Sequence, residues 1–476
     1  MKRAGAAFFA VMAAGLAACR APAAAPPGPA VIRVDRATTY QTITGWEATA
    51  EAGQHDEING GVSTLFLKYK DRLFDLAVSD LGLNRLRLEV RSGAENPRDY
   101  FAEFFEKRIS VAEWHRRRYE IVNDNRDPNV IAWTGFHFTE LDLVVRQIVE
   151  PIRERVNARG ERLHVLLNYV DFGRSRFEHY DNPEEYAEFI EAAFLHLRDT
   201  FGWTPDGVEL VLEPDNTPWD GHRLGRALVA TAQRLRRHGF HPCFTAPSTT
   251  AMVNAPMYFD GLASVSGAAG LLRELSYHRY RGSSEATLRT IAERAARYRL
   301  DTAMLEHIGS GYEDLHEDLT VANVSAWQQF ALAFPAEDNG AQYYVIDQTN
   351  RDAPGVHAGQ RTWFLRQYFK YVRSGARRVA ATSTSELFAP VAFVNHGGGL
   401  VLVVKAARAG AFTVDGLTEG RYGISYSTDT ERGAERPDVA VAAGHPLSTS
   451  IPARGVLTIH GRAGSPEVRP PRAACR

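Results

Sequence analysis

The sequence predicts a (β/α)8, or TIM, barrel followed by an antiparallel β-sandwich. Two observations carry this prediction. Short apolar or β-branched runs alternate with amphipathic helical stretches through residues 41–384, and the helical stretches stop beyond residue 385. Eight such alternations with right-handed crossovers close into a barrel. A doubly wound open sheet is the structural alternative, but no glycine-rich phosphate loop follows the first strand.

The expected barrel strands are mostly continuous apolar runs, as is typical of parallel strands covered by helices. In chain order they are YQTITGWEA (40–48), NRLRLEVRS (84–92), LHVLLNYVDF (163–172), GVELVLEPDN (207–216), PCFTAPST (242–249), ELSYHRY (274–280), TAMLEHIG (302–309) and AQYYVIDQT (341–349).

Helical stretches separate these strands, and most of them end on a glycine, which is a common helix stop. They are residues 65–82, 139–160, 182–202, 221–239, 284–300, 320–334 and 358–375. The segment 94–138 is longer than a usual βα loop and carries aromatic residues, as loops that wall a binding site often do.

Past the barrel, short alternating runs separated by glycines predict a β-sandwich over residues 385–462. Residues 31–40 are expected to add a strand to it before the chain enters the barrel. We expect residues 463–476 to form a disordered tail.

The amino terminus has the pattern of an export signal. Lys2 and Arg3 precede a short apolar run, and LAAC, Leu16 to Cys19, resembles a bacterial lipobox. That resemblance implies that residues 1–18 are removed and that the Cys19 thiol is lipidated; an ordinary secretory signal is the alternative. Residues 19–30 read as a Pro/Ala tether. Arg20 resembles the signal for outer-membrane sorting, so we expect an outer-membrane lipoprotein, facing the periplasm or the cell surface.

Composition narrows the class of partner. The formal net charge of −2 offers no field for a phosphate backbone, so nucleic acid is not expected. Cys243 and Cys475 do not make a disulfide framework, and neither has a partner at zinc-ligand spacing. We therefore expect no metal and no cofactor.

Two glutamates stand where barrel chemistry is found, at the carboxyl ends of strands. Glu213 is expected to end the fourth strand and Glu306 the seventh, which lie across the barrel mouth from each other. Such a pair is what glycosidic bond cleavage needs: one carboxyl group protonates the leaving oxygen, and the other attacks the anomeric carbon. Taken singly, each could be a solvated strand-end carboxylate.

This arrangement resembles the retaining glycoside hydrolases of clan A, and most closely glycoside hydrolase family 30 or an unassigned neighbour. The motifs that carry the resemblance, besides the two glutamates, are short but follow the family's order: YQTITGWEA, GLNRLRLEVRSG, SYHRY, YFKYVRSGARRV and PVAFVNHGGGLVLVVK. Cleavage by such a pair of carboxyl groups would require no cofactor.

The resemblance implies a role for each matching residue. Glu213 would be the general acid/base and Glu306 the nucleophile. Tyr280, or His278 beside it, would hydrogen-bond the nucleophile, and Arg87 would hold its charge. On physical grounds, a cation keeps Glu306 ionised, while burial and the opposing charge are expected to raise the pKa of Glu213. Alternatively, Arg87 only neutralises Glu89.

The sequence departs from the family at two places. Leu212 stands where the clan has an asparagine, and Asn168 or Asn216 could substitute for it. The tryptophan common at the end of strand eight is missing, with Tyr343 and Tyr344 nearby. Three other tryptophans could stack on sugar rings, although each could equally be core: Trp46, Trp133 and Trp219.

The function expected from these residues is retaining hydrolysis of a β-linked glycan or glycoside by double displacement. Two alternatives stay open. A non-catalytic glycan-binding lipoprotein could keep the barrel, and a transglycosylase would share the first half reaction.

Overall fold

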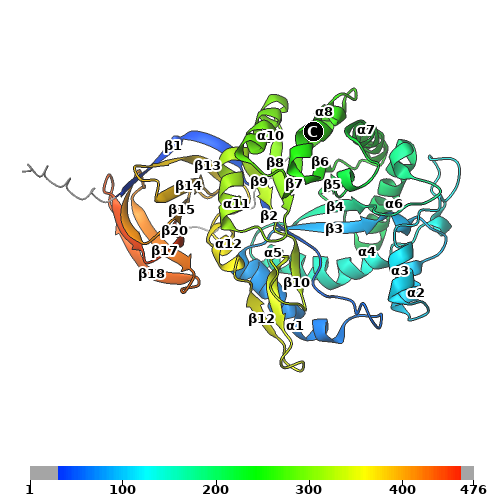
Figure 1. Cartoon of the computed structure of the whole chain (residues 1–476), viewed down its shortest axis with the longest axis horizontal. Helices are drawn as coiled ribbons and strands as arrows, with labels where there is room; N and C mark the ends of the chain where they lie inside the picture. Colours follow the sequence, from blue (N-terminus) through cyan, green and yellow to red (C-terminus); the bar gives the residue numbers. More distant parts are fainter. Residues whose placement is uncertain (1–29, 463–476) are drawn as a thin grey trace, which may run out of the picture.

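The computed structural model describes residues 30–462. A barrel and a separate β-sheet domain lie side by side, with the sheet domain at the left of Figure 1. The expected signal peptide, nearly all of the expected tether, and the expected tail fall outside the described residues.

Eight parallel strands close the barrel, as predicted. They are β2 (Gly45–Thr49), β3 (Arg85–Arg91), β4 (His164–Val170), β5 (Gly207–Glu209), β6 (Cys243–Ala251), β7 (Leu272–Arg281), β8 (Asp301–Glu306) and β9 (Val324–Trp327). Closure comes from the parallel pairing of β9 with β2, in which Gly45 lies opposite Ala326.

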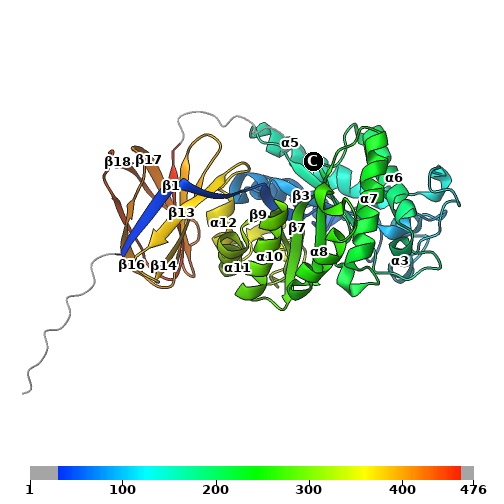
Figure 2. The same ribbon diagram turned by 90° about the horizontal axis from the view of Figure 1, so that it is seen from above.

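Helices cover the outside of the barrel (Figure 2). They are α1 (Thr64–Asp75), α4 (Thr139–Val144), α5 (Glu150–Ala158), α6 (Pro183–Phe201), α7 (Gly221–Arg237), α8 (Ala255–Ala263), α9 (Ala268–Leu271), α10 (Glu285–Tyr298), α11 (Tyr312–Glu317) and α12 (Thr362–Phe369). Of these, α8, α9 and α11 have no counterpart among the predicted helices. Two of the glycines predicted to stop helices, Gly82 and Gly202, do end their helices, and both have left-handed backbone angles.

The eighth strand differs from the prediction. Residues 320–334, predicted as a helix, contain β9 and β10 (Ala331–Phe334). The run predicted as strand eight is β11 (Gln342–Asp347), which pairs with β10 and with β12 (Gly355–Ala358) outside the closed barrel. All side chains of β9 are buried, so no polar face marks it as a strand, and its alanine and flanking glutamines are good helix formers.

A cluster of charged side chains fills the barrel interior near the amino-terminal ends of β3 and β7. Arg85 donates to Glu274 at 2.6 Å and to Glu47 on its other side, and all three side chains are buried. Branched aliphatic residues usually fill this space. Here the apolar part is a small cluster, Leu166, Ala303, Leu305 and Ala326. Because the single positive charge of Arg85 lies between two carboxylates, its burial is tolerated.

The sheet domain has nine strands within the described residues. They are β1 (Ala30–Thr42), β13 (Arg377–Ser383), β14 (Phe388–Val394), β15 (Leu400–Ala406), β16 (Gly410–Asp415), β17 (Gly420–Thr428), β18 (Ala434–Val441), β19 (Leu447–Ile451) and β20 (Gly455–Gly461). The pairing is antiparallel except between β1 and β16. One core joins strands from both ends of the sheet, for example through Phe412 and Ile459. Because β13 belongs to this sheet, the domain begins before the predicted residue 385.

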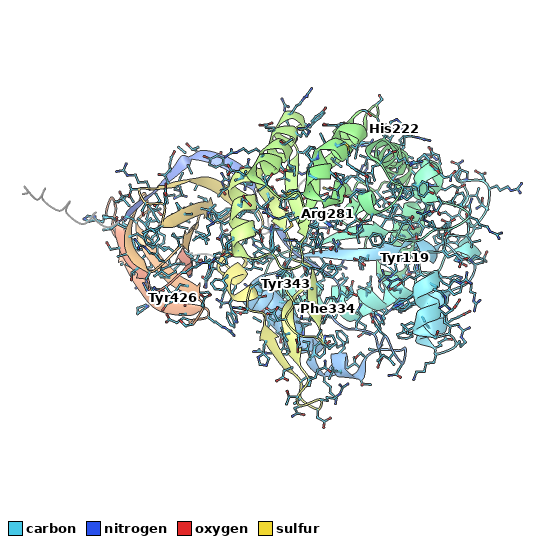
Figure 3. All side chains as sticks on the ribbon, in the orientation of Figure 1. Tyr119, His222, Arg281, Phe334, Tyr343 and Tyr426 are labelled. Carbon is cyan, nitrogen blue, oxygen red and sulfur yellow. The ribbon has the colours of Figure 1, made fainter. Side chains whose placement is uncertain are left out.

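The long segment between β3 and α4 folds into two short helices, α2 (Tyr100–Phe105) and α3 (Val111–Arg117), and irregular turns. Figure 3 shows its Tyr119 on the far side of the barrel from Tyr426 of the sheet domain. Cys243, at the start of β6, is disulfide-bonded, although no disulfide was expected from the sequence. Among residues 30–462, no helix has the length and apolar character needed to span a bilayer.

Candidate active site

Glu306 is the last residue of β8 and is held by two donors. Its Oε2 accepts from Nη2 of Arg87 at 2.5 Å, and its Oε1 accepts from the Tyr280 hydroxyl at 2.8 Å. Arg87 lies 3.7 Å from Glu89, so its nearer partner is Glu306. The two donors fix the direction of the Glu306 carboxylate.

Glu213 does not end a strand as predicted. It lies four residues beyond β5, in a turn, with φ of 50° and ψ of 56°. Its amide donates to Ser248 O at 3.2 Å, and the amide of Leu212 donates to Tyr169 O at 2.9 Å. A left-handed backbone at a non-glycine residue costs about 1–2 kcal/mol, and such strain is typical of functional sites.

The Glu213 carboxylate also has two partners. Oε1 lies 3.0 Å from Nδ1 of His278, and Oε2 accepts from Nδ2 of Asn216 at 2.9 Å. Asn216 donates to Thr250 as well, at 2.7 Å. The sequence left open which of His278 and Tyr280 contacts the nucleophile; in the structure Tyr280 contacts Glu306 and His278 contacts Glu213.

The three central side chains converge. One carboxylate oxygen of Glu213, one of Glu306 and one ring nitrogen of His278 all lie within 4.8 Å of one another. A similar set of atoms could hold a metal ion. Here both oxygens of Glu306 already accept from Arg87 and Tyr280, and a guanidinium beside the site disfavours a second cation.

The pKa of Glu213 differs from the expectation. Burial acts to raise it, as expected, but the hydrogen bond and the charge of His278 outweigh burial, and the pKa is lowered. The pKa of His278 moves the opposite way: burial acts to lower it, but the bond to Glu213 and the charge of Glu306 raise it. The prediction failed because the sequence did not place His278 against Glu213.

Asp215 is a positioning residue that sequence reasoning missed. Its carboxylate accepts from the amides of Thr250 and Ala251, at 2.7 and 3.0 Å, and from Nδ2 of Asn254 at 2.9 Å. These bonds tie the turn after Glu213 to the end of β6. The available signal was the spacing in EPDN, since aspartate in a turn commonly accepts backbone hydrogen bonds.

Phe330 is a second missed residue. It follows β9 at the barrel mouth, is partly exposed, and its ring lies 5.7 Å from the Arg87 guanidinium. It therefore supplies an aromatic surface near the carboxylates. Tyr343 and Tyr344 do not, because both are buried in β11. The tryptophan expected to be missing at the end of strand eight is present: Trp327 ends β9, the eighth barrel strand, and was overlooked because residues 320–334 were predicted as a helix. It is buried, and its Nε1 donates to Asp318.

Two of the three tryptophans predicted as sugar platforms are core residues. Trp46 is fully buried and stacks on Phe369 at 4.4 Å, and Trp219 is buried against Tyr186. Trp46 is directly followed by Glu47, which faces the barrel interior, so the tryptophan faces the helices. Trp133 is 49% exposed on the long loop and stays a candidate.

Asn168 lies in β4, in register with Glu89 and Glu209, and is fully buried. Neither amide atom has a hydrogen-bond partner among the described residues. Asn216, by contrast, contacts Glu213 directly. Of the two asparagines predicted to compensate for Leu212, only Asn216 is seen to contact a catalytic candidate in this structure.

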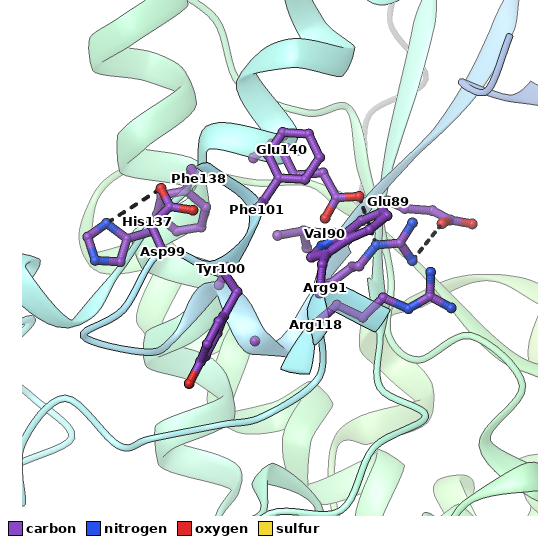
Figure 4. A pocket seen from close by; sticks show the side chains of 14 residues that line it. Glu89, Val90, Arg91, Asp99, Tyr100, Phe101, Arg118, His137, Phe138 and Glu140 are labelled. Atoms are coloured by element: carbon purple, nitrogen blue, oxygen red, sulfur yellow. Dashed lines mark hydrogen bonds and ion pairs between the residues drawn. The ribbon is translucent and has the colours of Figure 1, made fainter. Parts of the chain in front are cut away.

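Two adjoining cavities lie along β3, and Figure 4 shows the first of them. They share Glu89, Arg91 and Glu140, and Glu89 connects them to the site through its contact with Arg87. The first is walled by the long loop, including His137. Neither cavity is lined by Glu213 or Glu306 themselves.

Comparison with known proteins adds evidence about the fold. No family model matches the sequence, and no curated protein matches it either. Solved structures do match. A family 30 endoxylanase from Clostridium papyrosolvens is 15% identical, with 92% of this chain and all of that one covered and a TM-score of 0.63. The catalytic domain of a family 30 xylanase C from Talaromyces cellulolyticus is 16% identical, with coverages of 91% and 100% and a TM-score of 0.65.

A conserved exported protein from Bacteroides fragilis is also similar, at 15% identity, with 90% and 100% coverage and a TM-score of 0.67. At such low identity these similarities concern the fold. They confirm the resemblance, at the level of fold, to the barrel-plus-sheet architecture of family 30 glycoside hydrolases.

Proposed function

We propose that this chain is a retaining glycoside hydrolase that cleaves β-linked glycosides by double displacement. The observation that carries the proposal is the approach of Glu213 and Glu306 oxygens to within 4.8 Å. Retaining enzymes hold their carboxyl groups about 5–5.5 Å apart, whereas inverting enzymes leave about 6.5–9.5 Å for a water molecule.

In this proposal Glu306 attacks the anomeric carbon. Its negative charge must be available and aimed, and the two donors that hold it, Arg87 and Tyr280, fit that need. As the glycosyl bond forms, charge leaves the carboxylate and these hydrogen bonds weaken. They strengthen again when the glycosyl-enzyme is hydrolysed, so the same donors stabilise the departing carboxylate.

Glu213 would protonate the leaving oxygen and later activate water. Its lowered pKa and the raised pKa of His278 mean that the resting pair stores one proton mainly on the imidazole. We infer that this proton passes from Nδ1 of His278 to Glu213 across their 3.0 Å contact as the leaving group departs. Asn216 and Asp215 hold the turn in place.

The cavities indicate the substrate class. Their walls contain four acidic residues, Glu51, Glu89, Asp99 and Glu140, and two arginines, Arg91 and Arg118; Glu140 already binds Arg91 at 2.9 Å. Burial and the charge of Glu89 raise the pKa of Glu51 to about 7. Carboxylates accept hydrogen bonds from sugar hydroxyls and repel anions, so we propose a neutral or amino sugar rather than a uronic acid next to Glu306. Phe330 would stack on a sugar face.

The place of action is part of the proposal. The lipobox-like LAAC and the tether that follows support an exported protein held to a membrane by acyl chains on Cys19. Cys19→Ser should release the protein from membranes with its activity unchanged, because the tether separates the lipid from the fold. Retention of the substituted protein in the membrane fraction would contradict this.

The test is the stereochemistry of hydrolysis. A panel of aryl β-glycosides, including neutral, amino and uronic sugars, is incubated with the protein while proton NMR follows the anomeric signals. We expect the β-anomer to appear first, with Glu306→Gln inactive. First release of the α-anomer, or binding of glycans without turnover across the panel, would overturn the proposal; the second outcome would favour the non-catalytic binder. Transfer products would indicate a transglycosylase.

A further inference from the structure

A second cluster of acids lies where the long β3–α4 loop meets α6, apart from the carboxylates of the proposed active site. Asp124 comes from the loop, and Glu185 and Glu188 come from the first turns of α6. One oxygen from each lies within 4.8 Å of the other two. Two ligands on opposite sides of a calcium ion, with bonds of about 2.4 Å, are also about 4.8 Å apart. The three oxygens therefore fit around one ion.

Burial makes this cluster unlike a solvated acidic patch. Glu188 is 1% exposed, and neither of its oxygens accepts a hydrogen bond from any described residue. Asp124 Oδ1 and Asn123 Oδ1 are also buried without a donor in the described chain. All four orphaned atoms are acceptors. A buried acceptor without a donor is costly, and a hard cation satisfies several at once.

Neighbouring side chains of the protein neutralise or hydrogen-bond these carboxylates only in part. Nη2 of Arg234 lies 3.7 Å from Glu188, beyond hydrogen-bond distance, and its Nε binds Glu191 instead. The amide of Asn123 donates to Glu185 at 3.3 Å. Arg234 is therefore shared between Glu188 and Glu191, and neither Asp124 nor Glu185 has an ion pair within residues 30–462.

We propose that Asp124, Glu185 and Glu188 bind a calcium ion, with Asn123 Oδ1 and water completing the shell. Carboxylate and amide oxygens are the ligands that calcium prefers, and the ion would cross-link the loop to α6. The same loop continues through Trp133 to His137, which walls the larger cavity, so the ion would fix one wall of that cavity. The proposal does not depend on the glycosidase function.

Protonation of one carboxylate is the alternative way to reduce the repulsion among these buried acids. Burial, the neighbouring Glu185 and the charge of Asp124 raise the pKa of Glu188 to about 9, against the opposing charge of Arg234. A proton shared between Glu185 and Glu188 is the alternative to a bound ion.

The experiment uses the full chain, stripped with EDTA and dialysed. We expect one calcium bound per chain at 1 mM calcium by equilibrium dialysis, and a rise in Tm of about 2–5 °C that equimolar magnesium does not reproduce. Glu188→Gln should abolish both. Glu306→Gln, in the proposed active site, should keep them.

Two results would overturn the proposal. One is a wild-type protein that neither binds calcium nor changes Tm at 5 mM calcium, which would leave a proton-sharing acid cluster. The other is Glu188→Gln with an undiminished calcium response. Should Glu188→Gln fail to fold, Asp124→Asn replaces it with the same expected loss. A supporting readout is chymotrypsin cleavage at the exposed Trp133, which should be faster in the stripped protein.

Discussion

Nδ1 of the buried His278 lies 3.0 Å from Oε1 of Glu213, and this contact couples the protonation of the two side chains. The lowered pKa of Glu213 and the raised pKa of His278 are its two consequences. Glu213 adds stability that is present above its ordinary pKa of 4.5 and is lost as pH falls through the lowered value. His278 adds stability that is present below 6.5 and is lost as pH rises through the raised value. Both contributions are complete between pH 4.5 and 6.5.

The pH profile of activity should depend on this pair. In the wild type, loss of the shared proton sets the alkaline limb of kcat/KM, above the ordinary pKa of histidine. In His278→Gln the proton must sit on Glu213 alone, so the alkaline limb should move to lower pH. The measurement is kcat/KM against pH on one aryl β-glycoside. An unchanged limb would mean that His278 does not share the proton, and His164→Gln, whose histidine does not touch either carboxylate, serves as the control.

The left-handed backbone at Glu213 should be visible in stability. Glu213→Gly and Glu213→Ala both remove the carboxylate, so their difference isolates the backbone. We expect the glycine variant to have a free energy of unfolding about 1 kcal/mol larger than the alanine variant. At the exposed Glu293 in α10 the order should reverse, because glycine destabilises a helix. Equal stability of both Glu213 variants in urea unfolding would argue against strain at this residue.

Phe330 should contribute to substrate binding. Phe330→Ala removes the aromatic surface beside Arg87, and we expect kcat/KM to fall about 10-fold or more on a glycan substrate. Trp219→Phe is the matched control, since that side chain is buried in the core; it should lower Tm and leave KM unchanged. If Phe330→Ala keeps the wild-type kcat/KM, the platform lies elsewhere, and Trp133 is the next residue to test.

The sequence was sufficient for the fold class and for the strand-borne part of the site. Glu306 lies at the carboxyl end of a barrel strand, where reactive side chains of such barrels are found. The roles of Arg87 and Tyr280 beside it were implied by the resemblance to glycoside hydrolases, which left His278 as the alternative to Tyr280.

Features outside regular pairing were not predictable. Glu213 lies beyond β5 in a left-handed turn, and the pairing of β7 with β8 shifts register between Tyr277 and His278. Together these bring His278 to Glu213 instead of Glu306. Phe330 was missed because residues 320–334 have the composition of a helix, while their strand conformation comes from closing the barrel against β2. Trp46 was wrongly predicted as a possible sugar platform because the sequence did not show which side chains of its strand face the barrel interior and which face the helices.

The roles of the two glutamates are tested most directly by the leaving-group and azide dependence of Glu213→Ala and Glu306→Ala. If Glu213 is the acid/base, Glu213→Ala should lose about 10²–10⁴-fold on poor leaving groups, yet still form the glycosyl-enzyme from activated aryl glycosides. Azide should then restore turnover and give the β-glycosyl azide. Glu306→Ala should be inactive on both kinds of substrate, and any azide product should have inverted configuration. Equal losses for the two variants, independent of leaving group and not rescued by azide, would contradict these roles.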